Sequence, residues 1–164
     1  VTFIYAVAGF SLGGNIAYDF FCNNANMTEK AIIDSAPLFN FPSFVKNRFL
    51  KSYSKCLKKI KSGEYDVEKE LNKYFNGMGE HQKDIAPIVS QESLNNLIGS
   101  CYNTKVYKLH QDELKKVTFI YGSKDIARLC KTRIKKYHIH KMKGYGHCGF
   151  YRENPVASAK QFIL

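Results

Sequence analysis

The sequence of 164 residues lacks the patterns that mark several large classes of protein. Its five cysteines are scattered and never form a C-x-x-C pair, so neither a zinc site nor a disulfide framework is indicated, and a reducing cytoplasm is the expected location. No apolar run is long enough to cross a membrane. The apolar stretch 1–8 has no basic leader that would mark it as a signal peptide.

Acidic residues are scarce, with 14 Asp and Glu against 25 Lys and Arg, which gives a net charge of +11. No helix-turn-helix, zinc-finger or RNP-type pattern concentrates this charge, so nucleic acid is not an expected partner. A solvated basic surface is the favoured interpretation, and attraction to anionic lipid headgroups or acidic substrates is the alternative. Hydrophobic residues at 45% and aromatic residues at 14% predict a folded protein rather than a disordered one.

The most informative segment is 9–14, which reads Gly-Phe-Ser-Leu-Gly-Gly. It follows the β-branched and aromatic stretch 1–8, which predicts a strand buried on both faces. It precedes residues 15–22, whose apolar side chains fall on one side of a helix. A G-x-S-x-G sequence between a strand and a helix holds its serine, here Ser11, at the tip of a sharp turn. This context predicts a nucleophile elbow.

Steric and electrostatic reasons give the residues around Ser11 their expected roles. The residues two before and two after the serine are crowded against each other, so glycine is expected to be needed at Gly9 and Gly13. The new helix presents its first N–H groups toward the serine. The backbone N–H of Leu12 is therefore the predicted donor to an oxyanion.

Two later strands each end close to a residue that a nucleophilic serine requires. The stretch 117–121 is followed by Gly-Ser-Lys-Asp, which places Asp125 just past its end, and the stretch 137–142 is followed by Gly-Tyr-Gly-His, which ends in His147. Sites in open α/β sheets assemble at the carboxyl ends of the strands. The order serine, acid, histidine is the one associated with this type of elbow.

With these motifs the chain resembles the C-terminal portion of the α/β-hydrolase superfamily, of the capped serine esterase or lipase-like type. The resemblance runs from the elbow through a strand at 30–34 and the motifs at 122–125 and 144–147 to a final helix over 153–164. It implies an α/β fold, with a partial parallel sheet of about four strands, flanking helices and an inserted helical cap.

The resemblance also implies the roles of the three residues. Ser11 is the nucleophile, His147 the general base, and Asp125 the acid that orients the imidazole. No metal or cofactor is implied. The implied reaction is hydrolysis of a carboxylic ester or thioester, a small-molecule substrate, through an acyl-enzyme. The alternative is a truncated hydrolase of weak or no activity that acts as a binding or interaction module.

Other residues compete for the acid and base roles. Asp34 also ends a strand, and some members of the superfamily take their acid from that strand. Asp125 is favoured because Gly122 gives the tight exit of the family pattern. His138 and His140 alternate along one strand, which favours a structural or surface role for both.

Three further residues are weighed and set aside. His81 and His110 fall in or near the insertion, where solvated side chains are expected. Cys148 follows His147 directly, but adjacent residues on a turn usually point apart, so a buried packing role is favoured for its thiol.

The insertion is predicted over 39–112, with the core formed by 1–38 and 113–164. Apolar residues recur every three or four positions over 45–60, which predicts a helix, and weaker patterns follow over 67–75 and 85–102. The family places a helical cap here. Aromatic residues of the insertion are the candidates to line its pocket: Phe39, Phe41, Phe44 and Tyr102.

One departure from the family is serious. The strands that precede the elbow in complete members are absent from this sequence, and so is the loop that supplies a second oxyanion donor. A remnant of four strands is expected to expose an apolar edge strand. We therefore expect a fragment of a longer protein, or a chain that completes its sheet by pairing with a second copy or a partner chain.

Overall fold

The computed structural model describes residues 3–64, 66, 68–69, 72 and 84–162. The chain forms two compact units, one of Val1–Phe39 with Thr104–Leu164 and one of Asn40–Asn103. Residues 104–112, which the sequence places in the insertion, thus group with the larger unit. The role of the smaller unit as a cap stays a prediction. His81 and most of the helix expected over 67–75 lie outside the described residues.

The larger unit is built on a sheet of four parallel strands in the order β1-β2-β3-β4. This confirms the predicted fold class. The strands are β1 (Ile4–Phe10), β2 (Thr28–Asp34), β3 (Val117–Gly122) and β4 (His138–Met142). Their carboxyl ends meet at one edge, since Phe10 pairs with Asp34, and Asp34 with Ile120.

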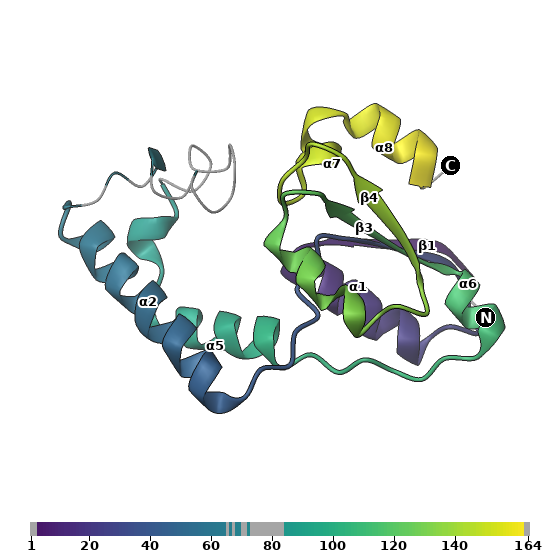
Figure 1. Ribbon diagram of the computed structural model, residues 1–164, viewed down its shortest axis with the longest axis horizontal. Helices are drawn as coiled ribbons and strands as arrows, with labels where there is room; N and C mark the ends of the chain where they lie inside the picture. The colour runs from purple at the N-terminus through teal and green to yellow at the C-terminus, as the bar shows by residue number, and fades with distance from the viewer. Residues whose placement is uncertain (1–2, 65, 67, 70–71, 73–83, 163–164) are drawn as a thin grey trace. The chain divides into compact units, whose positions relative to one another are not determined.

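Helices cover both faces of this sheet (Figure 1). One face carries α1 (Leu12–Asn23) and the 3-10 helix η2 (Ile126–Thr132), and the other carries α7 (Gly149–Glu153) and α8 (Pro155–Phe162). The short helix α6 (Gln111–Lys115) leads into β3. Successive strand residues serve opposite faces, as the pleat requires. Ile33 packs in the cluster with α1, while Ile32 packs with Phe162 of α8.

The final helix begins two residues later than its prediction over 153–164. It is α8, which begins at Pro155, whereas Glu153 is the last residue of α7. Proline has no N–H to continue a helix but is well suited to begin one. The Asn154–Pro155 pair therefore separates α7 from α8, and the predicted final helix is confirmed over Pro155–Phe162.

The smaller unit is helical in its described part. It contains α2 (Ser43–Lys61), the 3-10 helix η1 (Ala86–Ile88) and α5 (Gln91–Tyr102). The helix predicted over 45–60 is confirmed by α2. Its buried residue Leu57 packs against Leu94 and Ile98 of α5, so this unit has an apolar cluster of its own.

Candidate active site

Ser11 lies at the turn between β1 and α1, in a backbone conformation that side chains rarely adopt. Its φ is 53° and its ψ is −124°. Its backbone N–H donates to the carbonyl oxygen of Asp34 at 2.9 Å, which ties the turn to the neighbouring strand. Strained non-glycine residues of this kind gather at functional sites. Leu12 is the first residue of α1, so its N–H belongs to the unsatisfied N-terminus of a helix.

The positions of the elbow glycines differ in how much room they leave for a side chain. A Cβ on Gly9 would overlap the backbone carbonyl group of Gly13, so only glycine fits at position 9. At Gly13 a Cβ would meet no atom within 4 Å, contrary to the expectation that both glycines are required. The second crowded position is Gly14, whose Cβ would lie 2.8 Å from the Cβ of Ala36. Sequence reasoning missed Gly14, although it stands in the motif.

His147 connects Ser11 to Asp125. Its Nε2 lies 2.9 Å from Ser11 Oγ, and its Nδ1 lies 3.1 Å from Asp125 Oδ1. The three residues follow the ends of β1, β3 and β4. The parallel sheet therefore brings together side chains that lie up to 136 positions apart in the sequence. A Cβ on Gly122 would overlap the backbone of Tyr145, so glycine allows the two loops to approach.

Asp125 is held in place as well as buried, with a fractional exposure of 1%. Its Oδ1 also accepts from the N–H of Ala127 at 2.9 Å, which caps η2. Its Oδ2 is buried and has no hydrogen-bond partner among the described residues. The carboxylate is thus fixed toward the imidazole by one oxygen.

The environment of His147 favours its protonated form. Burial lowers the pKa of the imidazole, but the hydrogen bond and charge of Asp125, together with the Cys148 thiol, outweigh burial and raise the pKa above its ordinary value. The arrangement therefore stabilises an imidazolium between a carboxylate and a hydroxyl. An imidazole in this position can accept the proton of Ser11 and return it to a leaving group.

Asp34, the alternative acid, lies beside this group in a different role. Its side chain is 3% exposed, and its Oδ1 accepts from the hydroxyl of Ser35 at 2.8 Å. Burial raises the pKa of this carboxyl to about 6, and the charge of Asp125 adds to the rise, while Ser35 and His147 oppose it. It is the carboxylate of Asp125, however, that bonds the Nδ1 of His147.

The rival histidines and Cys148 have other contacts. His138 and His140 pack against each other on β4 with ring centroids 4.3 Å apart, and burial lowers the pKa of His140. His110 forms a capping box with Glu113 at the start of α6. Cys148 is buried and forms the N-cap of α7, but its thiol also faces His147, so the expected separation of the two side chains is incomplete.

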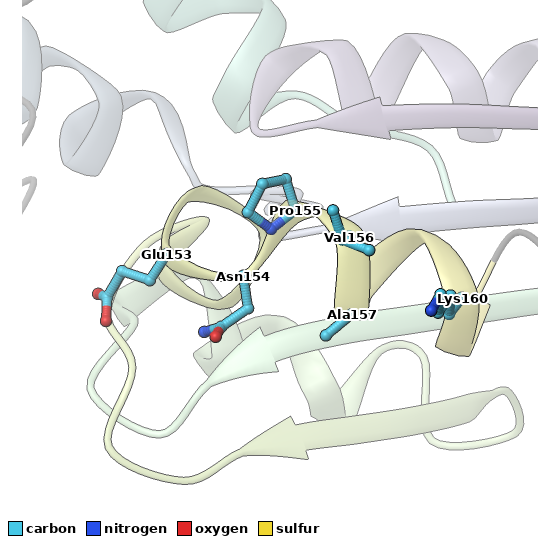
Figure 2. Close-up of a pocket in the computed structure, with 6 residues that line it drawn as sticks. All are labelled: Glu153, Asn154, Pro155, Val156, Ala157 and Lys160. Atoms are coloured by element: carbon cyan, nitrogen blue, oxygen red, sulfur yellow. The ribbon is translucent and has the colours of Figure 1, made fainter.

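A hollow of about 450 Å³ lies elsewhere in the larger unit (Figure 2). Residues of α7, α8 and the junction between them line it, and none of Ser11, Asp125 and His147 does. Within the described residues no group of three or more side chains is placed to hold a metal ion. The described helices include none with the length and apolarity to cross a membrane.

Several solved structures share the architecture of this chain. A bromoperoxidase from Bacillus anthracis matches with a TM-score of 0.64 and 14% identity, over 98% of this chain and 66% of that one. The carboxylesterase CesB from Bacillus subtilis matches with a TM-score of 0.57 and 17% identity, over 98% and 59%. This is the α/β-hydrolase fold. A marine microorganism esterase matches with a TM-score of 0.59 and 16% identity, over 98% and 70%.

The α/β-hydrolase fold is shared here without close sequence similarity. No family model and no curated protein matches the sequence. The chain spans about two thirds of the length of the bromoperoxidase that it matches. At identities of 14 to 17% the likeness shows the fold, and the reaction has to be argued from the site.

Proposed function

We propose that this chain carries the Ser-His-Asp triad of a serine hydrolase that cleaves a carboxylic ester or thioester. The observation that carries the proposal is the continuous chain of contacts from Ser11 Oγ through His147 to Asp125, at 2.9 and 3.1 Å. Supporting it, Ser11 is partly buried and has the strained backbone of a nucleophile at a strand-to-helix turn.

The geometry supports the following reaction. His147 Nε2 takes the proton of the Ser11 hydroxyl as its oxygen attacks the substrate carbonyl carbon. The N–H of Leu12 donates to the oxyanion that forms. The tetrahedral intermediate collapses, the imidazolium protonates the departing alcohol or thiol, and an acyl-serine remains. His147 then activates a water molecule, which releases the acid and restores the Ser11 hydroxyl.

Asp125 serves this cycle without changing its own charge. Its carboxylate accepts from Nδ1–H, which keeps Nε2 free to act as the base, and it stabilises the imidazolium after proton transfer. Burial of the carboxylate strengthens both effects, because less water screens its charge.

The proposal is tested by labelling the chain with a fluorophosphonate, which reacts with activated serine hydroxyls. We expect labelling that is lost in Ser11→Ala and in His147→Ala. His138→Ala is the matched control, since it removes an exposed imidazole from the preceding strand, and it should label normally. Protein that reacts with the probe is then assayed for hydrolysis of p-nitrophenyl esters and of acyl thioesters. The relative rates distinguish the two substrate classes.

Folded protein that resists the probe would overturn the enzymatic proposal for this chain. The alternative, an interaction module built on a hydrolase fold, would then take its place. Exposed side chains at the start of the outer strand β1 favour that alternative, because Phe3, just before the strand, and Tyr5, within it, are 61% and 53% exposed.

A further inference from the structure

Three non-glycine residues in the described part of the chain have a left-handed φ: 53° at Ser11, 56° at Ser35 and 52° at Cys148. All three lie at the candidate site or next to it. Such conformations cost free energy and persist only where the surroundings fix them. Ser11 is explained by its place in the elbow, and the other two need an explanation of their own.

Ser35 and Cys148 are joined to each other by a hydrogen bond. The backbone N–H of Cys148 donates to Ser35 Oγ at 2.8 Å, and the Ser35 hydroxyl donates to Asp34 Oδ1 at 2.8 Å. Ser35 is fully buried, and both partners are buried too. The hydroxyl thus uses its one proton toward Asp34 and accepts the N–H of Cys148 in return.

This hydroxyl connects the sheet to the loop of the histidine. Ser35 follows β2, and its own N–H donates to the carbonyl oxygen of Ile120 at 2.8 Å, so its backbone is fixed on two central strands. Cys148 directly follows His147, so the bond to its N–H holds the backbone beside the imidazole. A shift of this turn would move Nε2 away from Ser11 and Nδ1 away from Asp125.

We propose that Ser35 is the positioning residue for His147, with the carboxylate of Asp34 holding its hydroxyl in the orientation that accepts the N–H of Cys148. The inference rests on the proposed function and adds a residue to it. A hydrogen bond to a carboxylate is stronger than one between neutral groups, and it polarises the hydroxyl toward its second partner. Asp34 therefore acts on the histidine loop through Ser35, while Asp125 acts on the ring directly.

The test compares Ser35→Gly with the wild-type chain. Glycine removes the hydroxyl and accepts a φ of 56° without strain, so the substitution does not force the backbone at position 35 to change its conformation. We expect fluorophosphonate labelling of Ser11 to slow by about 10- to 100-fold, as a misplaced catalytic group does. On an ester substrate kcat should fall while KM changes little, because Ser35 does not reach the substrate.

Two further variants make the comparison specific. Ser123→Gly is the matched control, because its hydroxyl also accepts a backbone N–H of the same loop, that of Gly144 at 2.9 Å, at an exposed position away from the ring. It should label within about threefold of wild type, since the loop keeps its buried anchor. Asp34→Asn keeps an acceptor for Ser35 and should lose less than Ser35→Gly. Ser35→Ala, which removes the same hydroxyl, replaces Ser35→Gly if that variant does not fold.

A readout independent of activity completes the test. The ring of His147 is titrated by NMR in the wild type and in Ser35→Gly. Both proteins keep the charged and titratable groups that face the ring, which are Asp125, Asp34 and Cys148. We expect the pKa of His147 to fall in Ser35→Gly, because the ring no longer sits firmly against Asp125. An unchanged titration together with an unchanged labelling rate would overturn the role of Ser35. Absence of labelling in the wild type would overturn only the proposed function, since the titration still decides the position of the ring.

Discussion

One carboxylate oxygen of Asp125 holds the imidazole of His147 at 3.1 Å, while the other oxygen is buried and has no hydrogen-bond partner among the residues that the structure describes. A buried acceptor that makes no hydrogen bond is costly, so this carboxylate is placed for the ring rather than for its own stability. The cost is offset when the imidazole carries a positive charge, which is the state that forms in the proposed reaction when His147 takes the proton of Ser11.

Replacing Asp125 by Asn is therefore expected to reduce activity by a factor on the order of 10³ to 10⁴, as a wrong tautomer of the histidine does in such triads. The amide can donate to Nδ1, which would place the proton on Nε2, where the base has to be free. The second-order rate of fluorophosphonate labelling measures the effect. Asp34→Asn serves as the comparison, and an equal loss in both variants would count against Asp125 as the orienting acid.

The pH dependence of labelling should follow the ionisation of His147. The pKa of this imidazole is raised, so the neutral form that acts as a base predominates only above a pH higher than the ordinary value of about 6.5. Labelling should rise with pH, with its midpoint above 6.5, and the midpoint should move to lower pH in Asp125→Asn. Rates measured from pH 5 to 10 decide this, and a midpoint below 6 in the wild type would contradict it.

The parts of the site that follow from local sequence could be predicted, and those that depend on packing could not. Strands rich in β-branched residues, the G-x-S-x-G turn and the glycines before Asp125 and His147 each have a local signature. Ser35 and Cys148 have none, because the hydrogen bond that joins them links residues 113 positions apart and nothing beside them in the sequence marks their positive φ values. The division between α7 and α8 had a signal in Asn154–Pro155 that the prediction did not use.

Asp34 should make the stability of the chain depend on pH in the mildly acidic range. Its pKa is raised from 3.8 to about 6 in the folded chain, so the folded state binds more protons than the unfolded state between these values. Stability therefore falls as pH rises from 4 to 6, by roughly 2 kcal/mol, which is the larger part of the roughly 3 kcal/mol that a shift of this size contributes over the whole pH range. Asp34→Asn should lack this fall.

Urea unfolding at pH 4.5 and pH 7 measures the difference. Asp112→Asn is the control, because Asp112 is an exposed acid whose side chain bonds only the neighbouring Lys115 among the contacts described. It should keep the pH dependence of the wild type. The same slope in Asp34→Asn as in the wild type would show that another group titrates in this range.

Gly9 and Gly13 form a matched pair of substitutions within one motif. Alanine at position 9 would drive its Cβ into the backbone of Gly13, so Gly9→Ala should destabilise the fold by about 1–3 kcal/mol or more, because backbone atoms have to move. Gly13→Ala has open space within α1 and should stabilise it by up to about 1 kcal/mol. Thermal unfolding of the two variants tests the order, and equal destabilisation would contradict the packing at the elbow.

The free edge of β1 is expected to drive association of the chain. In the described part of the larger unit β1 pairs only with β2, and Phe3 and Tyr5 at the start of β1 are largely exposed. An unpaired strand edge with apolar side chains is a template for another strand, from a second copy or a partner chain.

Light scattering at increasing concentration should therefore show a mass above that of one chain. Tyr5→Lys should lower this mass, since lysine at an edge opposes pairing. Val156→Lys should not, although it removes an apolar residue of α8 that is even more exposed, at 67% against 53%. A single-chain mass at all concentrations in the wild type would show that the β1 edge does not recruit a second copy.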